Sequence, residues 1–372
     1  MRPELLISSR TRSTPFSSRV EACGVTAYTV YNHMLLPSIF RSLEEDYWHL
    51  CEAVQVWDVS CQRQVEISGP DSQKLVQLMT PRDLSKAELG QCFYAPLCDE
   101  TGGMINDPIL IKHSNNNWWL SIADSDVILW AKGLATGFGL NTKITEPNVW
   151  PLAIQGPKAE ELLLRVFGKD ISNIRFFRSK RLNYEGTKML VARSGWSKKG
   201  GFEIYVNNAE LGGQLWDELF KKGKDLNVGP GCPNLIERIE SGLLSFGGDM
   251  DYYTSPFECG LSKYVNLGAN IESLSIETLK IRKSKTKLIG LVIDKKISLK
   301  DMLVFTGNRV LGEITSNVWS PRYSVHLAFA KCNVNLLEDR QEKFVKTYSG
   351  EEVVKITNLP FDFPSLGLKP IR

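Results

Sequence analysis

One carboxylate interrupts an apolar stretch and is the first residue to consider for chemistry. Asp107 ends the segment Gly102-Gly-Met-Ile-Asn-Asp, in a strand predicted over residues 104–112, where a carboxylate can orient a ligand amine. An aspartate beside Asn and Pro also commonly binds its own backbone in a turn, and the residues alone favour that interpretation. Asp107 is therefore a candidate catalytic residue with a structural alternative.

A second group of candidates gathers around a strand predicted over residues 200–206. Side chains alternate between the two faces of a strand, so Glu203 and Tyr205 share one face and the apolar residues around them take the other. The turn that contains Trp196 brings an indole ring close to the Glu203 face, and such a ring can bind a cation. A solvated strand face and a Trp that fills a core gap are the simpler interpretations.

Aromatic residues also crowd the stretch Tyr28–Met34, which includes Tyr31, and the pair Phe176-Phe177. Most aromatic side chains belong to hydrophobic cores, so these positions by themselves indicate burial. Residue spacing alone therefore predicts a multi-domain α+β protein with a candidate aromatic pocket for a cation.

The apolar pattern predicts the elements that position these residues. The order of strand, Gly-Pro turn and apolar helix at Val65–Leu75 recurs at Ala153–Leu162, so two similar αβ units are expected, although Gly-Pro ends many strands. Beyond Ile276, short β-rich segments separated by Gly, Asn and Pro predict a small β-barrel or sandwich. Further elements are predicted over 42–53 (helix), 64–68 (strand), 72–79 (helix), 118–123 (strand) and 124–134 (helix).

The composition excludes several classes of protein. The chain has 372 residues, enough for two or three domains, and its 45 Lys and Arg against 42 Asp and Glu give a net charge of +3. This balance is too mild to indicate a nucleic-acid partner, for which a clustered basic surface is expected. The eight Cys form no CxxC pair and the four His no HExxH motif, so no metal site is predicted.

The sequence shows no targeting or membrane segment. The first 19 residues carry charges throughout and lack the apolar region of a signal peptide. The uncharged stretch 23–40 contains too many polar residues to span a bilayer. We therefore expect a cytoplasmic protein without a membrane partner.

Three widespread motifs, GxxxxGK[ST], GxGxxG after a strand and GxSxG, are absent from the sequence. The first two cradle the phosphates of nucleotides and dinucleotides, and the third presents a nucleophilic serine. Nucleotide-binding and serine-hydrolase functions therefore lack their usual sequence support.

Seven segments, taken together and in order, resemble the folate-dependent methyl- and aminomethyltransferases typified by the glycine-cleavage T-protein. The resemblance covers nearly the whole chain. It implies a three-domain cloverleaf of two αβ domains and a C-terminal β-barrel around a central folate site, with tetrahydrofolate as co-substrate. The segments are Thr14-Pro-Phe, Gly102-Gly-Met-Ile-Asn-Asp, Ala153-Ile-Gln-Gly-Pro, Ser194-Gly-Trp-Ser-Lys-Lys-Gly-Gly-Phe-Glu, Arg238-Ile-Glu-Ser-Gly, Ser255-Pro-Phe-Glu-Cys-Gly-Leu and Thr315-Ser-Asn-Val-Trp-Ser-Pro.

The departures from the T-protein pattern resemble one branch of this family, which demethylates the sulfonium zwitterion dimethylsulfoniopropionate. Trp196 stands where the T-protein has Tyr, and a sulfonium is a permanent cation that cannot donate a hydrogen bond. An aromatic face is its natural partner, worth about 2 kcal/mol when desolvated. The resemblance thus implies methyl transfer to tetrahydrofolate, giving 3-(methylthio)propionate and 5-methyltetrahydrofolate. It rests on residues 28–37, 54–59, 63–69, 192–198 and 227–241.

The resemblance also implies a role for each candidate residue. Asp107 matches the T-protein's catalytic aspartate, and we expect it to orient the folate amine and to stabilise the positive charge that arrives at N5. Folate contacts carry over onto Tyr94, Ser121, Ile122, Glu203 and Arg238. Candidates for contact with the sulfonium substrate are Trp196, Tyr31, Asn32, Phe176, Phe177 and Tyr205. The donor for the substrate carboxylate stays open among Asn32, His33, Lys198 and Arg193.

The expected domains are a discontinuous folate-binding αβ domain over 1–52 and 148–275, an inserted αβ domain over 53–147 and a β-barrel over 276–372. Two alternative functions remain. One is an aminomethyltransferase, or another folate-dependent demethylase of an amine or methoxy substrate. The other is a folate-binding protein without turnover. In each case we expect small-molecule partners and a monomer or homodimer.

Overall fold

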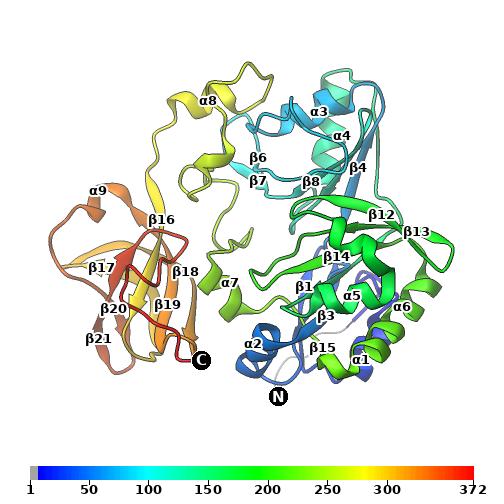
Figure 1. The fold of residues 1–372 in the computed structure, drawn as a ribbon. Coiled ribbons are helices and arrows are strands. Elements are labelled where there is room, and N and C mark those ends of the chain that lie inside the picture. The colour runs from blue at the N-terminus through cyan, green and yellow to red at the C-terminus, as the bar shows by residue number, and fades with distance from the viewer. Residues whose placement is uncertain (1–6) are drawn as a thin grey trace.

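The computed structural model describes residues 7–372, and its first sheet draws strands from separate parts of the chain (Figure 1). Neighbouring strands are antiparallel, except that β15 runs parallel to β3. Residues 1–6 of the expected range 1–52 lie outside the described residues. In sheet order the six strands are β12 (Ser179–Tyr184), β13 (Thr187–Ala192), β14 (Gly201–Val206), β11 (Trp150–Gln155), β3 (Val54–Asp58) and β15 (Val228–Pro230).

Three helices cover one face of this first sheet and bury its apolar side chains. Val20, Leu163 and Trp216, one from each helix, belong to the same buried cluster as the strand residues on that face. The helices are α1 (Ser17–Ala22), α5 (Ala159–Phe167) and α6 (Ala209–Lys222), and the short 3-10 turns η1 (Gly168–Asn173) and η2 (Lys224–Leu226) follow the last two.

The second unit is built on a five-stranded antiparallel sheet. Two helices pack on it, and their apolar residues, such as Leu75 and Ala131, form one buried cluster with the strand residue Trp118. Its elements are the sheet strands β10 (Lys143–Thr145), β4 (Gln64–Ser68), β9 (Asn117–Ser121), β8 (Ile109–Ser114) and β5 (Cys92–Tyr94), the hairpin β6 (Leu97–Cys98) and β7 (Met104–Asn106), and helices α3 (Ser72–Met79) and α4 (Val127–Gly137).

The third unit is a curled seven-stranded sheet near the C-terminus. Alternate residues of one strand face two different cores, as on any strand with both faces buried. Ile289 and Leu291 belong to the cluster inside the curl, whereas Leu288 and Val292 belong to a cluster shared with helices of the first unit. In sheet order the strands are β21 (Gly350–Val353), β20 (Lys343–Thr347), β17 (Leu299–Thr306), β18 (Arg309–Ser320), β19 (Val325–Asn333), β16 (Thr286–Ile293) and β22 (Lys355–Thr357).

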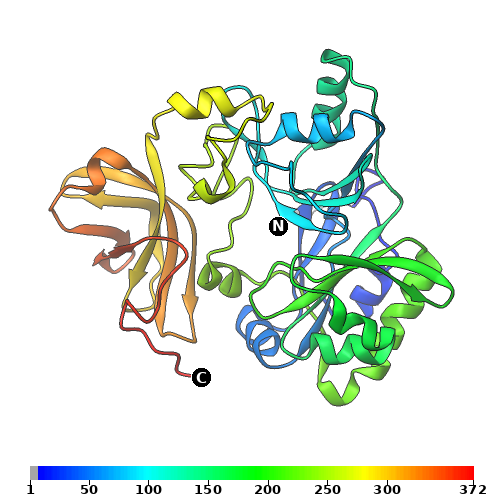
Figure 2. The ribbon, with the colours of Figure 1, turned by 45° about the horizontal axis from the view of Figure 1, so that its top comes forward.

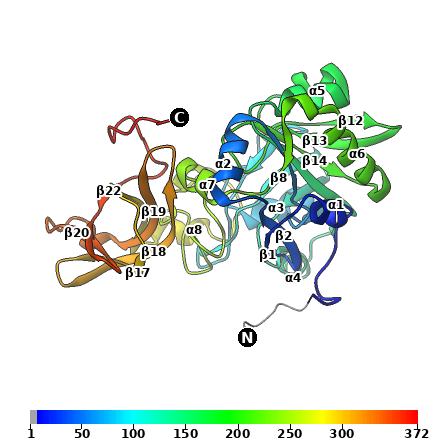
Figure 3. The same ribbon diagram turned by 90° about the horizontal axis from the view of Figure 1, so that it is seen from below.

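Two short helices join the first sheet to the curled sheet, and they lie side by side in Figures 1 and 3. Tyr47 of α2 (Leu43–Glu52) and Ile236 of α7 (Leu235–Ser241) pack in the same cluster as strands of the curled sheet. Asn234 caps α7, since its side chain accepts from two backbone N–H groups of the first turn. The other connecting elements are β1 (Ala27–Tyr31), β2 (Met34–Ile39), η3 (Ser262–Tyr264), α8 (Ile276–Ile281) and α9 (Val334–Leu337).

The predicted α+β class with two αβ units is confirmed, and the C-terminal part that we expected as a β-barrel or sandwich is the curled seven-stranded sheet; Figure 2 shows the three lobes. The helix predicted over 72–79 is α3, and that over 42–53 is α2. The strand predicted over 104–112 is instead two strands, because Asp107 and Pro108 interrupt it and proline has no N–H to donate to a sheet.

One strand of the first sheet comes from the range that we expected to form the inserted domain, 53–147. β3 pairs with β11 on one side and β15 on the other, and all five of its residues are buried. Val56 and Trp57 therefore face the cores on the two sides of the first sheet. The chain leaves this sheet only after Asp58.

No helix within residues 7–372 has the length and apolar content needed to cross a lipid bilayer.

A buried carboxylate, Glu258, fastens the segment after the first unit to the start of the curled sheet. Its Oε2 accepts from the N and Oγ of Ser255 at 3.0 and 2.8 Å. Its Oε1 accepts from the backbone N–H groups of Lys285 and Thr286 at 3.1 and 3.2 Å. Burial opposes ionisation, but these donors outweigh it and lower the pKa of Glu258.

We predict that Glu258→Gln destabilises the protein by about 1–3 kcal/mol, because one amide N–H₂ would face N–H donors and leave them unpaired. Urea unfolding at neutral pH measures the change. Glu277→Gln, which removes an exposed ion pair with Lys280, is the matched control and should change the unfolding free energy by less than about 0.5 kcal/mol. Equal stability of both variants would contradict the anchoring role of Glu258.

Candidate active site

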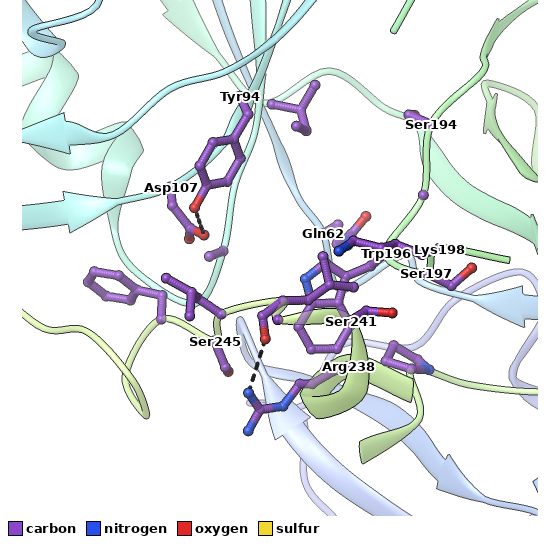
Figure 4. Close-up of a pocket in the computed structure, with 18 of the residues that line it drawn as sticks. Gln62, Tyr94, Asp107, Ser194, Trp196, Ser197, Lys198, Arg238, Ser241 and Ser245 are labelled. Atoms are coloured by element: carbon purple, nitrogen blue, oxygen red, sulfur yellow. Dashed lines mark hydrogen bonds between the residues drawn. The ribbon is translucent and has the colours of Figure 1, made fainter. Parts of the chain in front are cut away.

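A cavity of about 1560 Å³ lies where the three units meet. Its wall includes Asp107 from the second unit, Trp196 and Glu203 from the first and Lys287 from the curled sheet. Figure 4 shows side chains from several of these segments turned toward the same space. Sites for one drug-sized ligand measure roughly 300–1,000 Å³, so this cavity has room for two small molecules.

Asp107 and Tyr94 form one wall of the cavity (Figure 4). The Tyr94 hydroxyl donates to Oδ2 of Asp107 at 2.9 Å. Burial raises the pKa of Asp107 to about 7, although the hydrogen bond from Tyr94 favours the ionised form. Asp107 is therefore poised between its two protonation states near neutral pH.

Asn106 precedes Asp107 in the chain and holds the adjacent part of the cavity wall in place, and its side chain is fully buried. Its Oδ1 accepts from the backbone N–H of Ala123 at 2.9 Å, and its Nδ2 donates to the Ala123 carbonyl at 3.1 Å and to Ser125 Oγ at 2.8 Å. These bonds fix the chain just after Ser121 and Ile122, which line the cavity. Asn106 was not among the predicted site residues, although it stands in the Asn-Asp pair that the family resemblance covers.

Glu203 presents a second buried carboxyl group to the cavity. The Ser194 hydroxyl donates to its Oε2. Burial raises the pKa of Glu203, and the hydrogen bond from Ser194 only partly offsets this. Neither Glu203 nor Asp107 forms an ion pair with any residue from 7 to 372, so each can receive a positive or N–H-rich ligand group.

The loop that carries Trp196 is held at its base by Gln155, whose side chain is fully buried. Gln155 Nε2 donates to the Ser194 carbonyl at 3.2 Å, and Ser197 Oγ donates to Gln155 Oε1 at 2.8 Å. Gly195 lies directly over this amide with φ +147°, and a Cβ there would be 2.0 Å from Nε2. The glycine is thus required by close approach as well as by its backbone angle.

A second buried residue, Glu237 of α7, fixes the next part of the same loop. Its Oε1 accepts from the backbone N–H of Lys198 at 2.6 Å and from Ser241 Oγ at 2.7 Å. Its Oε2 lies 3.4 Å from the Lys199 ammonium. Gln155 and Glu237 were both missed from the sequence; the signal for Gln155 was the glycine pair that follows the loop, which indicates close packing.

Arg238 also lines the cavity, but its charge is already neutralised. Its guanidinium donates to Asp249 Oδ2 at 2.7 Å and to the Leu243 carbonyl at 3.2 Å, and it also donates to Ser316 Oγ. Asp249 is fully buried, so the pair is a structural part of the cavity floor. Only the guanidinium N–H groups that these partners do not use can donate to a ligand.

The structure brings ten of the predicted site residues to the cavity wall. Phe176 and Phe177 stand at the wall with ring centroids 4.6 Å apart. The ten residues are Tyr31, Tyr94, Asp107, Ser121, Ile122, Phe176, Phe177, Trp196, Glu203 and Arg238.

Asn32 and Tyr205 are predicted site residues that do not line the cavity. Asn32 Nδ2 donates to the carbonyls of Cys61 and Ala123 at 2.9 and 3.2 Å, so it joins the β1–β2 turn to the second unit. Tyr205 packs in a buried cluster behind the cavity, with its ring 6.0 Å from that of Trp119. Both lie behind the cavity wall, and for Tyr205 strand alternation alone could not distinguish this position from that of Glu203.

The fold is that of the glycine-cleavage T-protein class. The structure matches the glycine cleavage system aminomethyltransferase T of Bartonella henselae with a TM-score of 0.82, covering 94% of this chain and 97% of that one at 19% identity. The family described as the GCVT N-terminal domain matches residues 16–269. The chain belongs to this family.

Two sequence relatives narrow the place of the chain within this family. A dimethylsulfoniopropionate demethylase, DmdA of Ruegeria pomeroyi, is 48% identical over 326 residues, which is 86% of this chain and 89% of the relative. An aminomethyltransferase of Bacillus mycoides is 30% identical over 309 residues, 80% of this chain and 84% of the relative. The predicted family resemblance is confirmed.

We predict that Asp107→Asn removes a pH dependence from the stability of the protein. The folded carboxyl has a pKa of about 7 against an ordinary value of 3.8, so between these values only the folded state holds the proton. Wild-type stability should therefore fall as pH rises from about 4 to 7, by up to about 4 kcal/mol relative to the Asn variant. Urea unfolding of both proteins at about pH 5 and 8 should show about 3 kcal/mol of this change, and parallel pH profiles would contradict it.

Proposed function

We propose that the chain is a tetrahydrofolate-dependent methyltransferase that demethylates dimethylsulfoniopropionate, giving 3-(methylthio)propionate and 5-methyltetrahydrofolate. The observation that carries this proposal is the 48% identity to a dimethylsulfoniopropionate demethylase over 86% of the chain. Membership in the GCVT family supports tetrahydrofolate as the methyl acceptor.

The cavity fits a folate. Glu203 offers a carboxyl group to the N–H groups of a pterin, while Ser194 occupies one of its oxygens. The other expected folate contacts, Tyr94, Ser121, Ile122 and Arg238, line the same cavity. When bound, tetrahydrofolate supplies the nucleophilic N5.

The protein's task in this reaction is positioning, because the substrate is already activated. The methyl carbon exchanges its bond to sulfur for a bond to N5, the sulfur keeps the bonding electron pair as a neutral thioether, and the positively charged N5 then releases its proton to solvent water. No acid is needed at sulfur. Holding the two reactants in line within a cavity that excludes water can contribute roughly 7–11 kcal/mol to such a step.

Asp107 has two tasks in this proposal, both at the folate amine. As a carboxylate it orients N5 and stabilises the positive charge that arrives there, and Tyr94 holds it in place. Its pKa of about 7 means that the charged form is present in quantity at neutral pH. The positive charge on a bound sulfonium would favour that form further.

Trp196 is our candidate for the contact with the sulfonium. Its ring lines the cavity on a loop that Gln155 and Glu237 hold from two sides. A rigid loop matters because a ring attracts a cation only when the charge lies over its face, within about 6 Å. Tyr31, Phe176 and Phe177 are further aromatic residues of the same wall.

The alternative function is aminomethyl transfer, which the 30% identity to an aminomethyltransferase favours. Trp196 and the Ser-Lys-Lys run that follows it replace the T-protein's Tyr and Thr-Gly-Glu, and this argues against the glycine-cleavage role. We further propose a cytoplasmic monomer or homodimer whose partners are small molecules.

The first prediction of this proposal is product formation. Purified protein mixed with tetrahydrofolate and dimethylsulfoniopropionate should yield equal amounts of 5-methyltetrahydrofolate and 3-(methylthio)propionate, which chromatography with mass detection measures. Glycine-derived and methoxy donors tested in parallel are the controls. Product from those donors and none from the sulfonium would refute the proposal.

The second prediction concerns the charge of the substrate. Trp196→Leu should lower kcat/KM for dimethylsulfoniopropionate about 30-fold, which corresponds to about 2 kcal/mol, and Trp196→Phe should lower it less because a ring remains. Affinity for the product 3-(methylthio)propionate, whose sulfur is uncharged, should change much less in both variants. If product and substrate affinity fell equally, Trp196 would be acting through its size and not through its ring.

A further inference from the structure

The substrate of the proposed reaction is a zwitterion, and its carboxylate needs a cationic partner in the cavity. The sequence left four residues open for this role. Two of them do not line the cavity: Asn32, which binds backbone carbonyls, and His33, an exposed turn residue. The choice therefore falls on the cations of the cavity wall, which are Arg82, Arg193, Lys198, Arg238, Lys263 and Lys287.

Three of these cations already have polar partners. Arg238 pairs with Asp249 at 2.7 Å, and Arg193 pairs with Glu160 at 2.7 Å. Lys287 donates to the side-chain oxygen of Asn358 at 2.8 Å. A substrate carboxylate would have to compete with these partners.

Two more cations lie against aromatic rings. Arg82 stands over the rings of Phe93 and Tyr264, 5.3 Å from each centroid, and donates to the Tyr94 carbonyl. The Lys263 ammonium lies 4.9 Å from the centroid of the Tyr264 ring. Both charges are thus directed to the Tyr264 side of the cavity.

Lys198 is different, because its ammonium has no hydrogen-bond, ion-pair or ring partner anywhere in residues 7–372. Its backbone, in contrast, is fixed: the N–H donates to the buried Glu237 at 2.6 Å. Glu237 directs its other oxygen to Lys199, 3.4 Å away. The Lys198 side chain is exposed where it lines the cavity, and partial burial together with the neighbouring Lys263 and Lys199 cations lowers its pKa.

Lys198 also stands two residues after Trp196, on the same doubly anchored loop (Figure 4). Gln155 and Glu237 therefore fix the backbone that carries the aromatic ring and the ammonium. The substrate zwitterion has its cation and carboxylate only two methylene groups apart, so its two partners must lie close together, as residues of one short loop do. One rigid loop then offers a partner for each end of the substrate.

We propose that Lys198 binds the substrate carboxylate while Trp196 binds the sulfonium, so that the loop from Ser194 to Lys199 selects a zwitterion over a simple sulfonium. This inference rests on the proposed function. It assigns the loop a specificity role that is separate from the folate contacts of Glu203 and Tyr94.

The test removes each charge of the proposed ion pair separately. Mutation removes the Lys198 ammonium, and a change of ligand removes the carboxylate. Ethyldimethylsulfonium keeps the cation of dimethylsulfoniopropionate and lacks the carboxylate. Calorimetry measures the affinity of wild-type protein, Lys198→Met and Lys198→Arg for both compounds, with kcat/KM for dimethylsulfoniopropionate measured alongside. Lys263→Met, which removes the same charge from the same cavity, is the matched control.

Lys198→Met should weaken binding of dimethylsulfoniopropionate about 10- to 100-fold, as expected for a lost charge-assisted hydrogen bond, and binding of ethyldimethylsulfonium less than about twofold. Lys198→Arg should recover part of the loss. Equal losses for both compounds, or a selective loss in Lys263→Met instead, would overturn the assignment. If wild-type protein formed no 5-methyltetrahydrofolate from dimethylsulfoniopropionate, the proposed function itself would fail, which is a separate result.

Discussion

The cavity depends on one electrostatic constraint: its two buried carboxyl groups are held by hydroxyl groups and not by cations. Asp107 accepts from a tyrosine and Glu203 from a serine, whereas the nearby Arg238 is neutralised by its own aspartate. Burial raises the pKa of both carboxyl groups because no local positive charge offsets it. The wall therefore favours ligands that bring positive charge or several N–H groups, as a sulfonium and a pterin do.

Buried amide and carboxylate side chains keep this wall in place. Asn106 and Gln155 each stand at the end of a strand and bind the backbone of a neighbouring segment, and Glu237 does the same from a helix. Asn106 and Gln155 use both their amide oxygen and nitrogen in these bonds, so that each alternative arrangement would leave a donor or acceptor unpaired. The backbone of the loops around the cavity is thus fixed in position by the sheets and helices that support them.

The sequence predicted the architecture better than it predicted the inner surface of the site. The recurring strand, Gly-Pro turn and helix indicated two αβ units, and α3 begins and ends at the predicted residues. Alternation along β14 placed Glu203 and Tyr205 on one face, but only Glu203 reaches the cavity, since Tyr205 packs with Trp119 in a separate buried cluster. Such differences arise from the packing of one unit on another, which the local pattern does not contain. Gln155 was hidden for the same reason: its partners are about 40 residues away.

The position of β3 has a consequence for how the chain folds. The chain enters the second unit from β3 and returns to the first sheet as β11, which is the strand beside it, with Gln55 opposite Gln155. The whole second unit is therefore inserted in the chain between two neighbouring strands. While the second unit is unfolded, it is a long loop whose closure makes the pairing of β3 with β11 entropically expensive. Once the unit is folded, its two ends already lie close together and the pairing costs less entropy. We therefore expect the second unit to become structured before the first sheet is complete, an order that agrees with synthesis because five of the six strands of that sheet follow the second unit in the chain.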